Sequence, residues 1–425
     1  MILLTFSIFN SSAQDTSYAR KTINKLCAQK YHGRGYYKNG AIKSGTFIAS
    51  EMKKAGLKTL PNQTNYFQHF SFPVNVFENK MELIINGITL TPGIDFIVNA
   101  DCPSYEGNFT NSTVLIDNKN LDDSAFRDWC TWSTSIPIDK INFFRVFIID
   151  TIKQELEKKY SKWLSDLKAN NNTITFVKNK LTWTVDTKST NHIRFEVKHN
   201  LKFGLIKSLN RVSWKVNSRV KFTSQKNIIG YIPGTEKPDS FIFITAHYDH
   251  LGQMGKHAIF RGANDNACGV AMMLDMAIYY AKNPQKFSIV FIAFAGEEAG
   301  LIGSGYFVNN PIVPLKNIRF LVNLDLVGTG EEGGTVVNAT LLKREFNLLD
   351  SLNKMNHYLP ILIRRGKAAN SDHYYFSEAG VPSFFLYLAG PRPSYHDVKD
   401  IPRTITFAGY NGTFRLISAF LKELQ

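Results

Sequence analysis

The chain has 425 residues, 44% of them hydrophobic, and its 50 Lys and Arg against 35 Asp and Glu give a formal net charge of +15. This apolar content excludes wholesale disorder, and no stretch approaches the roughly 20 apolar residues of a spanning helix, which argues against stable membrane insertion. The basic residues are scattered and paired with acids, as in Gln154–Tyr160, so the charge indicates a solvated basic surface and no nucleic-acid partner.

The first fourteen residues have the pattern of an export signal. Met1–Phe9 is a short apolar run, and small residues follow it in Asn10–Ala13. This pattern predicts a signal peptide over residues 1–14 and a secreted or periplasmic protein, although the usual basic n-region is missing. The alternative is a first strand or a core segment.

Four cysteines (Cys27, Cys102, Cys130 and Cys268) are too few and too dispersed for a disulfide scaffold. One bridge could form, and the sequence does not choose its partners.

Taken in chain order, the first predicted element is an amphipathic helix over Gly40–Leu57. The residue pattern changes between about residues 65 and 224, where short β-type runs are separated by turns that contain Asn, Lys and Gly. We therefore expect a separate β-rich or mixed domain over 65–224. Its predicted elements are strands at Met81–Ile85, Ile174–Val177, Leu181–Val185 and Ile193–Val197 and a helix at Thr151–Leu167.

Residues 225–425 alternate between apolar strands and helices. Such a pattern predicts an α/β unit with a mostly parallel central sheet that is covered on both faces. The predicted strands are Phe241–Ala246, Ser288–Phe294, Ile318–Leu324 and Val381–Leu388, and the predicted helices are Ala267–Ala281 and Thr406–Leu424.

Metal-ligand residue types gather at the predicted carboxyl ends of these strands, where ligands bind in parallel sheets. The first strand ends in His247-Tyr248-Asp249, which suits a metal ligand with a carboxylate that orients it. Asp265 opens the next helix and could bridge two cations, although an isolated Asp there is more often an N-cap.

The second and third strands end in further acids. Glu297 and Glu298 are adjacent, so they point to opposite sides, and one can bind a metal while the other faces a substrate as a base. Asp325 follows the third strand, and Tyr395-His396 lies in a late loop. Each alone could be a turn or surface residue. Together, two histidines, three acids and a spare Glu are the ligand count of a hydrolytic two-metal site, and His with carboxylate suits zinc.

These motifs resemble those of the clan MH zinc exopeptidases, specifically the secreted aminopeptidases with a co-catalytic zinc pair. The similar segments, from about Asn227 to the C-terminus, are AHYDHLG, GANDNACG, FAGEEAGLIGS, NLDLVG, SDHYYF with EAGVPSF, and YHDVKD. Leu26–Leu57, including Gly33-Arg-Gly, resembles the family's N-terminal helix region more weakly. The resemblance implies a three-layer α/β/α zinc-exopeptidase fold, with a catalytic domain over 15–64 and 225–425 and peptides as substrates.

The resemblance also implies a role for each site residue. Asp265 would bridge two Zn²⁺ ions, His247 and Asp325 would complete one metal site, and Glu298 and His396 the other. Asp249 would orient His247, Glu297 would be the general base, and Tyr395 would hydrogen-bond the oxyanion. Asp372 lies in the similar SDH segment, where a helix cap is an equally good interpretation.

The inserted segment occupies the place of a protease-associated domain in some relatives, without that domain's usual glycine-rich strands, and a role as a lid or specificity module is a hypothesis. Three other functions stay open. A glutaminyl cyclase would use one zinc and lack the full histidine pair, and a non-catalytic binding protein would have lost ligands or the base. A carboxypeptidase would need a basic pocket, for which Arg364, Arg365 and Arg392 are candidates.

Overall fold

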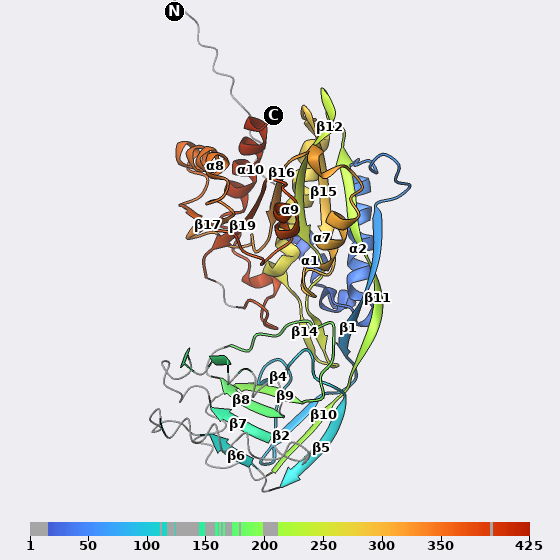
Figure 1. Cartoon of the computed structure of the whole chain (residues 1–425), viewed down its shortest axis with the longest axis vertical. Helices are drawn as coiled ribbons and strands as arrows, with labels where there is room; N and C mark the ends of the chain where they lie inside the picture. The colour runs from blue at the N-terminus through green and yellow to red at the C-terminus, as the bar shows by residue number, and fades with distance from the viewer. Residues whose placement is uncertain are drawn as a thin grey trace, which may run out of the picture.

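The computed structural model describes residues 16–110, 113–116, 124, 144–148, 158–159, 161–162, 165, 172–177, 180–198, 211–391 and 394–425. Its larger part is a ten-stranded sheet flanked by helices, and two smaller sheets lie beyond one end of it (Figure 1). None of the described helices is long and apolar enough to cross a membrane.

The large sheet has the strand order β14-β13-β1-β11-β15-β12-β16-β19-β17-β18. Its middle strands β15, β12, β16 and β19 are all parallel, and antiparallel pairs flank them. The strands are β1 (Phe67–Phe77), β11 (Ser218–Ile232), β12 (Lys237–His247), β13 (Gly252–Met254), β14 (Ala258–Phe260), β15 (Phe287–Phe294), β16 (Ile318–Leu324), β17 (Gly333–Val337), β18 (Leu362–Arg364) and β19 (Ser383–Ala389).

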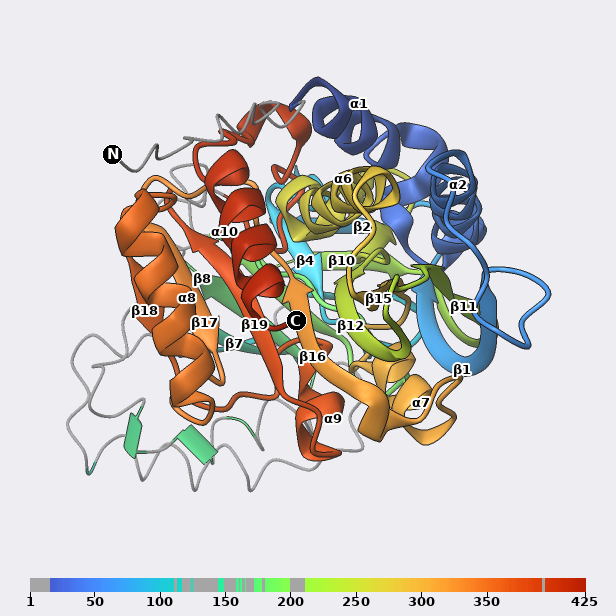
Figure 2. The same cartoon turned by 90° about the horizontal axis from the view of Figure 1, so that it is seen from above.

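Helices cover both faces of this sheet, as Figure 2 shows. One face carries α1 (Thr16–Leu26), α2 (Gly40–Lys54), α6 (Cys268–Lys282), α8 (Lys343–Asn356) and α10 (Tyr410–Glu423). The other carries the shorter α7 (Ile302–Asn309) and α9 (His373–Glu378).

Side chains of β12 alternate between two cores because successive strand residues face opposite sides. Ile242 and Ile244 belong to the core under α6 and α10, whereas Phe243 packs on Phe307 of α7 and Phe376 of α9. A strand buried on both faces needs apolar side chains on both, which explains the continuous apolar run Phe241–Ile244.

The segment between β1 and β11 forms two further sheets. One has the order β3-β2-β10-β5 and the other β4-β9-β8-β7-β6. Their strands are β2 (Glu82–Ile85), β3 (Ile88–Thr89), β4 (Phe96–Val98), β5 (Tyr105–Thr110), β6 (Thr113–Ile116), β7 (Phe144–Ile148), β8 (Thr173–Val177), β9 (Arg194–Lys198) and β10 (Arg211–Val216). β1 and the first part of β11 (218–224) fall within the predicted insert range 65–224, yet the two strands pair along all of β1 and join the large sheet.

The fold class predicted from the sequence is confirmed, as are the predicted strands and helices of the catalytic part to within a few residues. The predicted strand Leu181–Val185 is wrong, because these residues are extended without pairing into a sheet. The export signal, Cys130, Arg392 and most of the predicted helix Thr151–Leu167 lie outside the described residues. Cys27, Cys102 and Cys268 are buried and free, so no bridge joins any two of them.

Candidate metal centre and active site

The parallel strands bring the predicted site residues to one edge of the sheet. His247 is the last residue of β12, Asp325 follows β16, and Glu297 and Glu298 follow β15 by a few residues. Because β15, β12 and β16 are adjacent and parallel, their carboxyl ends meet.

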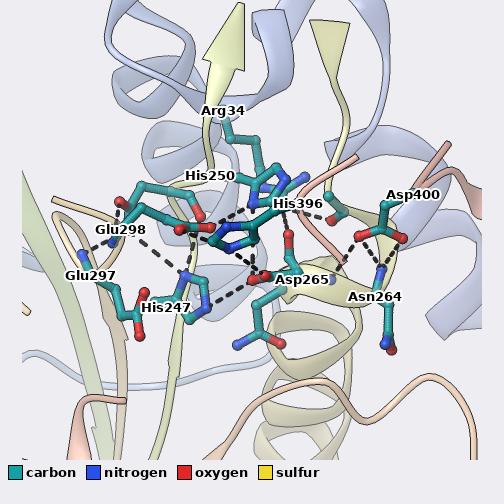
Figure 3. Close-up of polar contacts among 12 residues, drawn as sticks. Arg34, His247, His250, Asn264, Asp265, Glu297, Glu298, His396 and Asp400 are labelled. Atoms are coloured by element: carbon teal, nitrogen blue, oxygen red, sulfur yellow. Dashed lines mark hydrogen bonds and ion pairs between the residues drawn. The ribbon is translucent and has the colours of Figure 1, made fainter. Parts of the chain in front are cut away.

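Asp265 lies at the centre of the cluster, in the short helical turn η4 (Ala263–Ala267) that precedes α6. One carboxylate oxygen is 3.3 Å from Nε2 of His247, and the other is 3.2 Å from Nε2 of His396 (Figure 3). Its two oxygens therefore face different histidines.

An acid accompanies each of those histidines. Oδ1 of Asp325 is 3.4 Å from Nε2 of His247, and Oε2 of Glu298 is 3.2 Å from Nε2 of His396. The cluster thus divides into two His–carboxylate pairs with Asp265 between them, which is the grouping that the sequence resemblance implies.

The donor set fits divalent cations. Three carboxylate side chains and two imidazoles are buried together, which is costly for the acids without a neutralising charge. Oδ1 of Asp325 is buried and accepts no hydrogen bond among the described residues. Nitrogen and carboxylate ligands in this combination suit zinc.

Asp249 lies beside His247, but its carboxylate hydrogen-bonds other groups. Nδ1 of His247 lies 3.2 Å from the Asp249 backbone oxygen and 3.9 Å from its carboxylate. The carboxylate accepts the Tyr36 hydroxyl at 2.6 Å and the backbone N–H groups of Glu297 and Glu298 at 3.2 and 3.3 Å. Asp249 therefore fixes the turn that presents both glutamates.

Asp325 is held by a buried relay of polar side chains. Ser371 donates a hydrogen bond to Oδ2 of Asp325 at 3.0 Å, and Asn323 donates one to Ser371 at 2.8 Å. Thr245 of β12 in turn donates to Asn323 at 2.8 Å. The relay leaves Oδ1 of Asp325 facing His247.

The loop that carries Asp265 is fixed by two charged residues that the sequence analysis did not assign. Asp400 accepts the backbone N–H groups of Asn264 and Asp265. Arg34, which is fully buried, donates to the backbone oxygens of Tyr248 (2.8 Å), Arg261 (2.6 Å), Gly262 (2.7 Å) and Asp265 (3.1 Å). Its guanidinium therefore ties the end of β12 to the Asp265 loop (Figure 3).

His250 is a third histidine of the cluster. It is buried, and its Nδ1 lies 2.6 Å from Oε1 of Glu298 and 3.9 Å from Asp265. The HYDH sequence contains this residue, but its place beside Glu298 depends on how the loop folds after β12.

The two adjacent glutamates differ in their electrostatics. Burial raises the pKa of Glu298, but the charge of His396 and the hydrogen bond from His250 outweigh it and lower the pKa to about 2. Burial also raises the pKa of Glu297. The charge of His247 opposes this effect, whereas the charges of Glu298 and Asp325 add to it, so the pKa lies well above its usual value.

For Asp265, burial raises the pKa, and the hydrogen bonds from His247 and His396 outweigh it, which leaves the pKa well below its usual value. Burial raises the pKa of Asp372 to about 7, against the opposing charge of His247. Asp372 precedes α9 as predicted for a cap, but its side chain makes no cap hydrogen bond.

A cavity of about 240 Å³ opens beside the cluster. Glu297, Asp265, Asp325 and His396 line it on the cluster side, whereas Glu298 does not. Tyr395 also lines it, and its ring stacks on that of His396 with centroids 3.9 Å apart. Glu297 therefore faces open space into which a substrate can enter.

Comparison with known proteins finds similarity in the part of the chain that carries this site. The sequence profile described as "Peptidase family M28" matches residues 227–421. Aminopeptidase YwaD of Bacillus subtilis (strain 168) is 33% identical over 193 residues, which are 42% of this chain and only 40% of that protein.

Two solved structures share the fold over nearly the whole chain. The zinc aminopeptidase BSAP from Bacillus subtilis has a TM-score of 0.69 at 19% identity and covers 96% of this chain and 95% of its own. The aminopeptidase from Aneurinibacillus sp. strain AM-1 has a TM-score of 0.65 at 19% identity, covering 97% and 94%. The fold is therefore that of these two solved structures, and residues 227–421 of this chain are similar to peptidase family M28.

Proposed function

We propose that the chain is an aminopeptidase that holds two zinc ions and removes residues from the N-terminus of peptides. The observation that carries the proposal is the position of Asp265 between two buried His–carboxylate pairs, with Glu297 beside them on the cavity wall. The family match and the relative named as an aminopeptidase support the same reaction class.

The proposed ligands follow from the pairing. His247 and Asp325 would hold one ion, Glu298 and His396 the other, and the two oxygens of Asp265 would serve both. Nδ1 of His247 faces the Asp249 backbone oxygen, so a proton on Nδ1 leaves Nε2 free as a ligand. When bound, a zinc pair supplies a polarised scissile carbonyl and a water of lowered pKa.

The chain's own residues would handle the proton. Glu297 accepts the proton of the attacking water and returns it to the leaving amine, a task that needs a carboxylate near the water but outside the ligand set. Asp249 holds the backbone of Glu297 in place. Tyr395 lines the same cavity, where its hydroxyl would donate to the oxyanion.

Release of amino acids from a panel of aminoacyl-p-nitroanilides tests the proposal. The protein as purified should be active, lose activity with a chelator, and regain it when zinc is restored, with two zinc ions bound per chain. Absence of cleavage of every free-amine substrate by the zinc-loaded protein would refute the aminopeptidase assignment.

A carboxypeptidase is the second candidate, because Arg365 lines the cavity and could bind a C-terminal carboxylate. N-acetylated peptides separate the two activities: a carboxypeptidase cleaves them, whereas an aminopeptidase does not. Export remains a prediction from residues 1–14, and the N-terminal sequence of the native protein would test it.

A further inference from the structure

The lining of the active-site cavity includes one arginine, Arg365, besides the acids and His396. Leu326, Phe385 and Tyr387 give this part of the cavity an apolar and aromatic lining, and Arg365 and Asn370 lie beside them. A cation in the same cavity as the proposed reacting groups can bind another part of the substrate.

The side chain of Arg365 is held by a hydrogen bond and keeps further N–H donors that could bind a substrate. Arg365 follows β18, and its backbone N–H donates to Val336 at 3.0 Å, which fixes the residue against β17. Nη1 donates to the hydroxyl of Tyr387 at 3.1 Å, and Tyr387 lines the same cavity. A guanidinium has five N–H donors, and over the part of the chain that the structure describes no carboxylate lies within ion-pair distance of it.

We infer that Arg365 determines specificity by binding a carboxylate of the substrate, an inference that rests on the proposed peptidase function. The planar guanidinium can bind a carboxylate through a bidentate pair of hydrogen bonds, which a neutral side chain cannot reproduce. The apolar wall at Leu326 and Phe385 suits the methylene groups that lead to such a carboxylate.

A peptide offers this carboxylate from two sources. It can be the side chain of a glutamate or aspartate at the N-terminus, or the C-terminal carboxylate of a peptide short enough to fit within the cavity. Both would make the enzyme prefer an acidic substrate over its uncharged amide.

The neighbouring Arg364 provides a matched control. Its guanidinium lies over the ring of Phe346 at 4.7 Å from the centroid and donates to Asn347 at 2.8 Å, both on α8. The Arg364→Gln variant therefore removes the same charge one residue away without changing the cavity lining.

The test measures kcat/KM for two substrate pairs with the zinc-loaded enzyme. The first pair is the p-nitroanilides of glutamate and glutamine, and the second is Leu-Ala and its C-terminal amide. The wild-type enzyme should prefer the acid in at least one pair. The Arg365→Gln variant should reduce that preference about tenfold to a hundredfold, the range for a charge-assisted hydrogen bond, and Arg364→Gln less than twofold.

The substrate pair whose acid preference falls in Arg365→Gln identifies the source of the carboxylate. If Arg365→Gln changes neither preference while leucine p-nitroanilide is cleaved normally, the role of Arg365 is refuted and the aminopeptidase proposal stands. If the zinc-loaded wild type cleaves no free-amine substrate, the proposed function fails and this inference fails with it.

Inhibition of the wild type gives a second measurement that needs no variant. Free L-glutamate should inhibit cleavage of leucine p-nitroanilide more strongly than L-glutamine if the carboxylate is that of an N-terminal side chain. If the Arg365→Gln protein does not fold, Arg365→Lys is the replacement, because it keeps the charge and loses the paired donors. An unchanged preference for the acid over the amide in Arg365→Lys would count against bidentate binding of the carboxylate.

Discussion

Glu297 and Glu298 illustrate how two identical neighbours acquire different tasks. Glu298 contacts His250 and His396 and is absent from the cavity wall, whereas Glu297 lines it. Glu297→Gln should therefore keep two zinc ions per chain and lose 10²- to 10⁴-fold in kcat, the usual contribution of a general base. Metal analysis and steady-state kinetics on the same sample check both parts.

The matched control is Glu106→Gln, which makes the same change at an exposed position paired with Lys215 in the insert. It should leave both the zinc content and kcat unchanged. Loss of zinc in Glu297→Gln together with ordinary activity would show that the base has been assigned to the wrong residue.

Arg34 is the buried residue on which the Asp265 loop depends. Arg34→Lys keeps the charge but cannot reach four carbonyl oxygens at once, so at least one bond of about 1.5–3 kcal/mol should be lost from the free energy of unfolding. Since the loop presents Asp265, zinc affinity should also fall about tenfold to a hundredfold. Urea unfolding and zinc competition with a chromogenic chelator measure the two effects.

An exposed cation supplies the control for this prediction. Arg219→Lys alters a pair with Glu78 that is open to solvent and should leave both quantities unchanged. Reduced stability in Arg34→Lys with full zinc affinity would mean that Arg34 supports the fold but not the metal ligands.

The sequence reveals the residues at strand ends and those in recognisable motifs such as His396, and it misses Arg34 and Asp400, which long-range contacts bring to the site. His247, Glu298 and Asp325 could be predicted because strand ends in a parallel sheet share an edge. Arg34 reaches Gly262 across 228 residues, and no local pattern encodes such a contact. Its neighbour Gly33 has φ +63° and lies so close to Phe260 that a side chain would meet backbone, which explains the Gly33-Arg-Gly sequence only once the fold is known.

At the scale of elements, the insert contacts the loop that carries Tyr395 and His396. It does so through the segment around Leu181–Val185, which was wrongly predicted to be a strand. The backbone N–H of Trp183 donates to the His396 oxygen at 3.0 Å, and Lys180 donates to the Tyr395 oxygen at 2.9 Å. An alternating sequence predicts an extended backbone, but whether it pairs in a sheet depends on its neighbours. Here the neighbour is a loop of the catalytic part.

This contact predicts that the insert controls one side of the metal centre. Trp183 stacks on Phe260 at 4.7 Å and donates to the Val98 oxygen, so Trp183→Ala should cost about 3–5 kcal/mol. His396 has a left-handed φ of +57°, which needs support from its surroundings. Zinc titration of Trp183→Ala should show weakened binding of one ion, the one assigned to His396, and little change in the other.

Trp214→Ala is the matched control, because Trp214 is buried in the insert sheet on β10 beside Tyr105. It should destabilise the insert without selective loss of one zinc ion. Equal weakening of both ions, or of neither, in Trp183→Ala would contradict a link between the insert and the His396 loop.

For the whole molecule, the site concentrates acids at the centre of an otherwise basic protein. Asp265, Glu298, Asp325 and Glu297 lie together where the parallel strands end, and divalent cations of the proposed kind would offset their negative charges. Zinc binding should therefore stabilise the fold as well as enable the chemistry.

Zinc that binds only the folded chain at a hundredfold excess over its Kd stabilises it by about 2.7 kcal/mol, which raises the Tm on the order of 5 °C. Calorimetry of chelator-treated protein should show that rise when zinc is added back, and Asp265→Asn, which loses the carboxylate charge proposed to serve both ions, should show little or none. The fold fixes the strand ends independently of the metal, so the treated protein should still unfold cooperatively. A Tm that does not respond to zinc in the wild type would mean that these acids are not the zinc ligands.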